Sequence, residues 1–314
     1  MIQPFSYLSN ACRSVRMRLN TFLRVNAYVA TGARSRKADA AYQRGRGYLY
    51  GDGLPHDPTM AVVWLMQAAE RGHAPAQHIL SMIYLTGVRG WAAAGIWLDE
   101  ASHGTEAAIA NANLLYPQGL AVTPDANAAF AWAKAAAQQG LAHAEANLGM
   151  LYARGIGCDI DFAQAAHWYK RAAAKGDPAG ALGLGILCEN GLGVPKDTSE
   201  AARWYLMSAS QDNDVAATAL GLLHLGGLLA DSNPTEAARL LAGPAARGNL
   251  TAQYRLGLLY LEGQGLTRSQ TRARAWLSEA ARRGHKEATI ALQQIALTEH
   301  EGESATLGTS ALPV

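Results

Sequence analysis

The chain lacks the sequence features of disulfide-bonded, nucleic-acid-binding and membrane-spanning proteins. Its 314 residues include three cysteines, Cys12, Cys158 and Cys188, and an odd number without paired spacing does not describe a disulfide framework. The net charge of +2 is too small to predict nucleic-acid binding, and the basic residues are not clustered with aromatics. No apolar run is long enough for a conventional signal peptide or a membrane span. We therefore expect no nucleic-acid partner.

Motifs for catalysis, cofactors and metals are also missing from the sequence. It has no His-Glu-x2-His helix, phosphate-binding Gly-x4-Gly-Lys loop, Gly-x-Ser-x-Gly elbow or Ser-x2-Lys pair. Pairs such as Gly155 with Gly157 recur at the same place in several segments, which indicates turns between helices rather than phosphate binding. No group of histidines has the spacing of metal ligands. The sequence predicts a non-enzymatic protein without a cofactor or a bound metal.

Repetition is what the sequence has in abundance. One large apolar residue returns at steps of 33, 35, 36, 36, 36 and 36 residues, and the set is Trp64, Trp97, Trp132, Trp168, Trp204, Leu240 and Trp276. A second set precedes the first in each segment and consists of Tyr48, Tyr84, Tyr116, Tyr152, Cys188, His224 and Tyr260. Two such sets in each segment predict two helices in each of about seven repeats.

Local signals mark where the predicted helices begin and end. Each second helix is preceded by a residue that favours the N-cap, and these residues are Asp57, Gly90, Asp125, Asp161, Asp197, Asn233 and Ser269. The helices are expected to end at Gly72, Gly104, Gly140, Gly176, Asp212, Gly248 and Gly284. The first helices share a small residue that is followed four positions later by Leu in most repeats, as in Ala144 and Leu148. This spacing places the apolar residues on one helical stripe.

The clearest copies of the two helices read ANLGMLYARGIG and AAHWYKRAAAKG, at residues 146–157 and 165–176. Both patterns resemble the Sel1-like repeat, a 36-residue relative of the tetratricopeptide repeat. The resemblance implies an all-α fold, a right-handed α-solenoid of about seven helix-turn-helix repeats with a C-terminal capping helix. Each helix pair is too small to bury its own apolar face, so stacked neighbours build the core. Two departures stand out: the second repeat is shortened between Gly87 and Trp97, and Pro244 falls inside a predicted helix.

Three regions follow from this pattern: a basic amphipathic segment at 1–37, the repeats at 38–298 and a disordered tail at 299–314. The first region contains seven basic residues and no acidic one, since the first acidic residue of the chain is Asp39, and its apolar residues share one helical face. It is interpreted as a targeting or membrane-surface helix, a cap, a partner-binding segment or the product of an upstream start codon. The cytoplasm is favoured as the compartment, with targeting or membrane association as the alternative.

Positions that the repeat pattern leaves free on the first helices are the candidates for function. In tetratricopeptide-like folds these helices line a concave face, and the resemblance implies the same arrangement here. The candidates are Tyr42, Arg46, Tyr50, His78, Met82, Asn147, Met150, Arg154, Glu189, Asn190, Tyr254, Arg255 and Glu262. Aromatic residues, Met and Arg are enriched at protein interfaces. We expect an adaptor or scaffold whose partner is a peptide or helix of another protein.

Two alternatives come from other classes of function. Cysteine-rich relatives in the same family have been suggested to bind β-lactams or to act as hydrolases, but the cysteines of this chain do not follow their pattern. The second alternative is a membrane-surface tether, in which residues 1–37 make a peripheral membrane contact and the repeats bind the partner.

Overall fold

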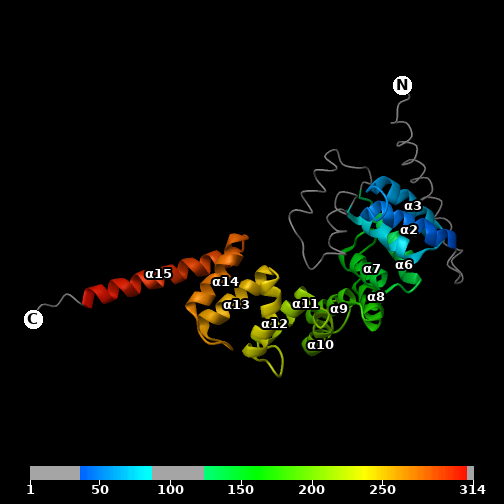
Figure 1. The fold of residues 1–314 in the computed structure, drawn as a ribbon. Helices are drawn as coiled ribbons and strands as arrows, with labels where there is room; N and C mark the ends of the chain where they lie inside the picture. Colours follow the sequence, from blue (N-terminus) through cyan, green and yellow to red (C-terminus); the bar gives the residue numbers. More distant parts are fainter. Residues whose placement is uncertain (1–35, 87–123, 310–314) are drawn as a thin grey trace, which may run out of the picture. The chain divides into compact units, whose positions relative to one another are not determined.

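The computed structural model describes residues 36–86 and 124–309, and every regular element within these ranges is an α-helix (Figure 1). Two compact units divide the chain, unit 1 up to Gly183 and unit 2 from Leu184. The helices are α2 (Arg36–Tyr50), α3 (Pro58–Glu70), a helix at 74–86, α6 (Ala126–Gln138), α7 (Ala142–Arg154), α8 (Phe162–Ala174), α9 (Pro178–Asn190), α10 (Thr198–Ala209), α11 (Asp214–Leu225), α12 (Pro234–Ala246), α13 (Leu250–Glu262), α14 (Gln270–Arg282) and α15 (Lys286–Thr309). The helix-turn-helix repeats predicted from the sequence are confirmed. No helix in these ranges is both long and apolar enough to cross a membrane.

The predicted caps hold the starts of the second helices. In each case a side-chain oxygen accepts a hydrogen bond from a backbone amide of the first turn, which satisfies an otherwise free donor. The caps confirmed in this way are Asp57, Asp125, Asp161, Asp197, Asn233 and Ser269. The predicted Gly90 cap lies outside the described residues. At the other ends, Gly140 and its counterparts have positive φ, and Asp212 takes the same conformation with φ 60.

Close contact between paired helices depends on a glycine in the first helix. A Cβ atom at Gly149 would lie 2.7 Å from the Tyr169 ring, and one at Gly257 would lie 2.8 Å from Cγ of Leu277. The same relation joins Gly45 to Leu65, Gly185 to Tyr205 and Gly221 to Leu241. A larger residue at any of these glycines would push the paired helices apart. The Leu-Gly dipeptide of the repeat therefore has a direct packing role.

The repeat that contains α6 differs from the arrangement expected from the sequence. In the regular repeats the cap of the second helix donates its backbone N–H to the residue at the Tyr position of the first helix, as Asp161 does to Tyr152 at 3.0 Å. Asp125, the cap of α6, makes this bond at 2.8 Å to Tyr84 in the helix at 74–86. The sequence assigns the helix at 74–86 and α6 to consecutive repeats, whereas the structure pairs them within one repeat. Trp97, Tyr116 and Gly104 lie outside the described residues.

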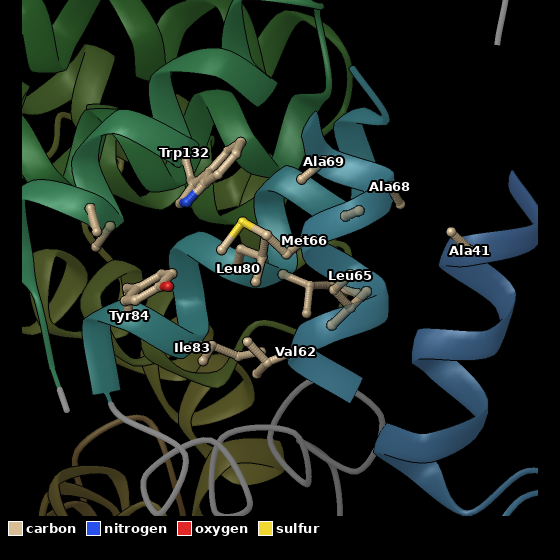
Figure 2. Close-up of a cluster of buried hydrophobic side chains, with 14 residues drawn as sticks. Ala41, Val62, Leu65, Met66, Ala68, Ala69, Leu80, Ile83, Tyr84 and Trp132 are labelled. Carbon is tan, nitrogen blue, oxygen red and sulfur yellow. The ribbon is translucent and has the colours of Figure 1, made fainter. Parts of the chain in front are cut away.

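The core of this joined repeat continues into its neighbour (Figure 2). Leu65, Leu80, Ile83 and Trp132 are each 0 to 1% exposed and belong to one buried cluster with α3 residues such as Met66. Small residues, Ala68 and Ala69 among them, allow the helices to approach closely. The helix at 74–86 is therefore packed on both sides, against α3 and against α6.

The C-terminal part of unit 2 ends as a capped stack. Ala288, Ala291 and Ile295 of α15 pack in one buried cluster with Leu277 and Ala280 of α14. At the position where the other first helices have glycine, α15 has the exposed Gln293, which opposes close packing of a further second helix. The helix includes residues 299–309, where the sequence predicts a disordered tail. Of the basic segment predicted at 1–37, only Arg36 and Lys37 fall in the described residues, as part of α2.

Pro244 does not interrupt α12, although the sequence suggested a local bend or loosening there. The helix runs unbroken from Pro234 to Ala246, and Pro244 is buried in its last turn. A proline lacks a single backbone N–H, so only the i→i−4 hydrogen bond that residue 244 would donate is lost.

Candidate protein-interaction surface

The most complete group of predicted contact residues lies on α2. Tyr42, Arg46 and Tyr50 are four residues apart, so they form one stripe along the helix. All three side chains are half-buried, and the Arg46 guanidinium lies 5.5 Å from the centre of the Tyr50 ring. This distance allows a cation–π contact that holds the arginine over the tyrosine. The structure thus brings these three predicted residues together.

His73 fixes the first tyrosine of this stripe. Its ring stacks on Tyr42 with 4.2 Å between the ring centres. Nδ1 of His73 accepts a hydrogen bond from the amide of Ala76 at 3.2 Å and so caps the helix at 74–86. The proton must then sit on Nε2, which lies 3.2 Å from Oδ1 of Asp39. One buried histidine therefore ties α2 to the start of the next first helix.

His78, Met82, Asn147 and Met150 lie on the facing first helices of unit 1. Asn147 is buried, and its Nδ2 donates to the hydroxyl of Ser81 at 2.9 Å. Its first role is therefore to join α7 to the helix at 74–86. His78, Met82 and Met150 are half-buried, and Arg154 at the end of α7 is exposed. These partly accessible side chains, rather than Asn147, are available to a partner.

A histidine–aspartate pair that the sequence reasoning missed lies beside His78. His143 is largely exposed, and its Nδ1 is hydrogen bonded to Asp177, whose side chain is 1% exposed. The bond to Asp177 raises the pKa of His143. Burial, together with the nearby charge of His143 and against the opposing effect of Asp177, lowers the pKa of His78 to about 4. At neutral pH His78 is therefore uncharged.

A second missed group surrounds Glu145, which is fully buried on α7. Arg171 of α8 and Lys175, the residue that follows this helix, hold its two carboxylate oxygens at 2.7 Å and 2.8 Å. Lys175 also donates to the carbonyl of Gly140 at 2.7 Å. The sequence contained a signal for this group. In three repeats the small residue of the first helix is followed directly by a polar residue, Gln77, Glu145 or Gln253, and each of the three is buried. A polar residue at a buried repeat position predicts that its side chain is hydrogen bonded within the fold.

In unit 2, the two candidates on α9 make contacts within the fold. The Tyr205 hydroxyl donates to Glu189 at 2.5 Å, and burial together with this bond raises the pKa of Tyr205. The side chain of Asn190 donates to the carbonyl of Ile186 at 2.8 Å. Glu189 is thus a packing residue as much as a surface residue.

The candidates on α13 repeat the arrangement seen on α2. Tyr254 stacks on His285 with 4.7 Å between the ring centres, and Nδ1 of His285 lies 3.3 Å from the Ala288 amide that it caps. The Arg255 guanidinium lies 5.6 Å from the centre of the Tyr254 ring. Tyr254 and Glu262 lie eight residues apart, and Arg255 and Glu262 are exposed. Each unit therefore presents a half-buried tyrosine fixed by a capping histidine.

The arrangement offers contacts for recognition. Its aromatic rings and guanidinium groups are held in place before any partner arrives, which lowers the entropy lost on binding. Within the described ranges, no group of three or more His, Cys, Asp or Glu side chains is placed to hold a metal ion.

Comparison with known proteins agrees with this geometry. The Sel1 repeat model matches residues 38–73, 107–141, 142–177, 178–213, 214–242 and 250–285. A Sel1 repeat protein from Oxalobacter formigenes is similar in structure, with a TM-score of 0.62, 26% identity and coverage of 81% of this chain and 89% of that chain. A search of curated protein sequences found no match.

Two further structures show weaker similarity. A protective antigen of uropathogenic Escherichia coli strains has a TM-score of 0.42 and 27% identity, with coverage of 83% of this chain and 65% of that one. An immunity protein from Pseudomonas aeruginosa has a TM-score of 0.44 and 18% identity, with coverage of 80% and 83%. The family assignment rests on the Sel1 repeat model, whose matches together cover more than half of the sequence. The chain belongs to the Sel1 repeat family.

Proposed function

We propose that the protein is a non-enzymatic adaptor that holds an acidic segment of another protein against its first helices. The observation that carries the proposal is the stripe of Tyr42, Arg46 and Tyr50 on α2. Its guanidinium is held over an aromatic ring, and its two tyrosines are half-buried, so each has surface left for a partner. Tyr and Arg are the residue types that most often dominate binding energy at protein interfaces.

The charge environment supports an acidic partner. Within the described part of the chain, no carboxylate forms an ion pair with Arg46, Arg154 or Arg255. Arginines of the second helices, such as Arg239 and Arg282, are instead paired with neighbouring glutamates at 2.6 and 2.8 Å. A carboxylate of a partner would form a charge-assisted hydrogen bond with Arg46 without first breaking an internal pair.

The test compares the full chain with an Arg46→Glu, Tyr50→Ala variant in affinity capture from lysate of the source cell. A matched control is Lys170→Glu, which reverses one charge at an exposed position on the second helix α8. Circular dichroism first establishes that all three proteins are folded. We expect one or more proteins to be captured by the parent and the control and lost from the double variant.

The captured partner then allows a quantitative measurement. Titration calorimetry with the identified segment should show at least about a tenfold weaker affinity for the double variant, the loss that removal of one strong interface contact causes. Equal capture by all three proteins, or equal loss in the Lys170→Glu control, would contradict a role for the α2 stripe.

A further inference from the structure

Helix α15 has an apolar stripe on the side that faces away from α14. Ile290 and Leu297 are 53% and 64% exposed, whereas Ala288, Ala291 and Ile295 are buried against α14. Ile290 and Leu297 are two helical turns apart, so they lie on one face. At 3.6 residues per turn this face is opposite the buried one. Two large apolar side chains of α15 therefore point to solvent.

The preceding first helix shows what normally covers these positions. Counted from the small residue of each helix, Ile290 and Leu297 of α15 correspond to Tyr254 and Leu261 of α13. Both α13 residues are partly buried against the cluster that contains Ala288 of α15. In α13 the stripe is thus covered by the next repeat, whereas in α15 it is exposed at the open end of the stack.

The stripe of α15 matches itself when two such helices lie antiparallel. Ile290 and Leu297 are equally far from the midpoint between Gln293 and Gln294, so an antiparallel second helix centred there places Ile290 opposite Leu297. The same symmetry places the exposed Lys286 opposite position 301, which is a glutamate. A two-fold axis requires this kind of self-complementarity, because each contact occurs twice with the roles exchanged.

The two ends of the repeat stack differ in their suitability for contact with another copy. Arg44 is exposed on α2 at the position where α13 has the core residue Leu256, so the first described helix presents a charge where a stacked neighbour would need an apolar residue. At the other end, α15 has 24 residues against 13 in α14 and runs past it (Figure 1). Contact between two α15 helices is therefore favoured over stacking of α15 on α2.

We propose that α15 is the contact between two copies of this chain, which pair tail to tail about a two-fold axis between Gln293 and Gln294. Ile290 of each copy packs on Leu297 of the other, and Lys286 pairs with Glu301 at both ends of the contact. The paired segment, from Lys286 to position 301, is about 24 Å long at 1.5 Å per residue. A contact this short predicts a reversible dimer in the micromolar range.

The first test measures the mass of the full chain by sedimentation equilibrium at several concentrations. The test variant carries Ile290→Glu and Leu297→Glu, and the matched control is Leu206→Glu, which changes a leucine on α10 that is 54% exposed. Circular dichroism first establishes that all proteins are folded, as expected for exposed positions. The parent and the control should dimerise equally, and the test variant should dimerise at least about a hundredfold more weakly.

An exchange of charges tests the register. Lys286→Glu alone sets two like charges against each other at both ends of the contact, so dimerisation should weaken about tenfold. Glu301→Lys alone should have the same effect. The two changes in one chain restore opposite charges across the axis, and the double variant should dimerise like the parent. A double variant as weak as the sum of the single changes would overturn the antiparallel register.

Cross-linking tests the direction of the helices in a background with Cys12→Ser, Cys158→Ser and Cys188→Ala. Gln293→Cys places the two thiols close to the axis, so a short bifunctional thiol reagent should link the copies. Lys286→Cys places them fifteen positions apart, about 22 Å in an antiparallel pair, and should not give this link. Equal linking through position 286 would overturn the antiparallel arrangement.

Three further results would overturn the proposal. They are a parent that stays monomeric at every concentration at which it is soluble, a dimer that survives Ile290→Glu with Leu297→Glu, and an equal loss in the Leu206→Glu control. If the parent is monomeric but captures another protein from lysate that the Ile290, Leu297 variant does not capture, the stripe belongs to that partner and not to a second copy.

Discussion

One buried repeat position has different chemistry at α7 in unit 1 and at α13 in unit 2. In unit 1 the buried residue after the small residue of α7 is Glu145, held by Arg171 and Lys175. In unit 2 the corresponding residue of α13 is Gln253, whose Nε2 donates to the carbonyl of Ala245 at 3.0 Å. This repeat position is therefore ionic at Glu145 and neutral at Gln253, and it is also neutral at Gln77 of unit 1, whose Nε2 donates to the carbonyl of Ala69 at 3.0 Å.

The caps of the first helices differ in the same way. Asp177 accepts the amide of Gly180 at 2.8 Å in unit 1, and Asn249 accepts the amide of Ala252 at 3.0 Å in unit 2. Both oxygens satisfy the same backbone donor, but Asp177 also has an ionisable partner in His143. The repeat fixes the geometry of each joint and leaves its charge free to vary. Sensitivity to pH at these joints should therefore be concentrated in unit 1.

The largest expected effect comes from removing the cations around Glu145. Arg171→Ala with Lys175→Ala leaves a fully buried carboxylate without its partners, and we expect a loss of about 3 kcal/mol in the free energy of unfolding. Adding Glu145→Gln should recover most of this loss, because the amide can donate to Ala137, the counterpart of Ala245. Urea unfolding followed by circular dichroism measures both changes. An unchanged midpoint for the double variant would refute an ionic role for this joint.

The reverse exchange in unit 2 should cost somewhat less. Gln253→Glu buries a carboxylate where the counterpart of Arg171 is the acidic Glu279, and we expect a loss of about 2 kcal/mol. Adding Glu279→Arg supplies the missing cation next to Arg283, the counterpart of Lys175, and should restore much of the stability. Thermal unfolding of the single and double variants checks the coupling. Additive losses would show that the two units do not share one design.

Much of the fold is predictable from one sequence because its signals are local. A cap such as Asp161 acts within three residues, and the period repeats each signal several times, so the helices and their ends follow directly. The pairing of α6 with 74–86 was not predicted, because repeat assignment assumed that order along the chain is order in space. The observed pairing is recognised from the bond of Asp125 to Tyr84 and from the burial of Leu80 and Ser81, which are contacts between residues distant in the sequence.

The candidate surface was predicted less completely than the fold. Helical spacing alone identified the stripe of Tyr42, Arg46 and Tyr50. The same spacing cannot show that Asn147 is buried against Ser81, because the two residues are 66 positions apart in the chain. Contacts between repeats depend on which side chains face each other, and the repeat pattern leaves those positions variable.

A smaller effect is expected from the caps. Asn249→Ala removes the acceptor for the Ala252 amide and should cost about 1 kcal/mol, while Asn249→Asp keeps the acceptor and should cost little. Differential scanning fluorimetry of the two variants measures the difference. A loss as large for Asn249→Asp as for Asn249→Ala would mean that the side-chain amide, rather than the accepting oxygen, is what the position requires.

The smallest effect is a pH dependence in unit 1. Bonding to Asp177 raises the pKa of His143 above 6.5, so its stabilising contribution is complete below pH 6.5 and is lost as pH rises through the folded value. For Asp177 burial acts upward, but hydrogen bonds from His143 and the Gly180 amide prevail and lower the pKa below 3.8. Its contribution is complete above pH 3.8 and is lost as pH falls through the folded value. The pair therefore stabilises the fold most between about pH 4 and 6.5.

His143→Gln should remove this dependence, with a loss of about 0.5 kcal/mol at pH 5.5 and less at pH 8, because the His143 ring is mostly in water. The control is His167→Gln on α8, an exposed histidine without an ion pair in the described part of the chain. Histidine resonances followed by NMR give a second measurement. The charge of His143 lowers the pKa of His78, so His143→Gln should move the titration of His78 upward from about 4. If the pKa of His78 does not change in this variant, the charge of His143 does not act on His78. Of the groups compared in unit 1, only Glu145 would then have an ionic role.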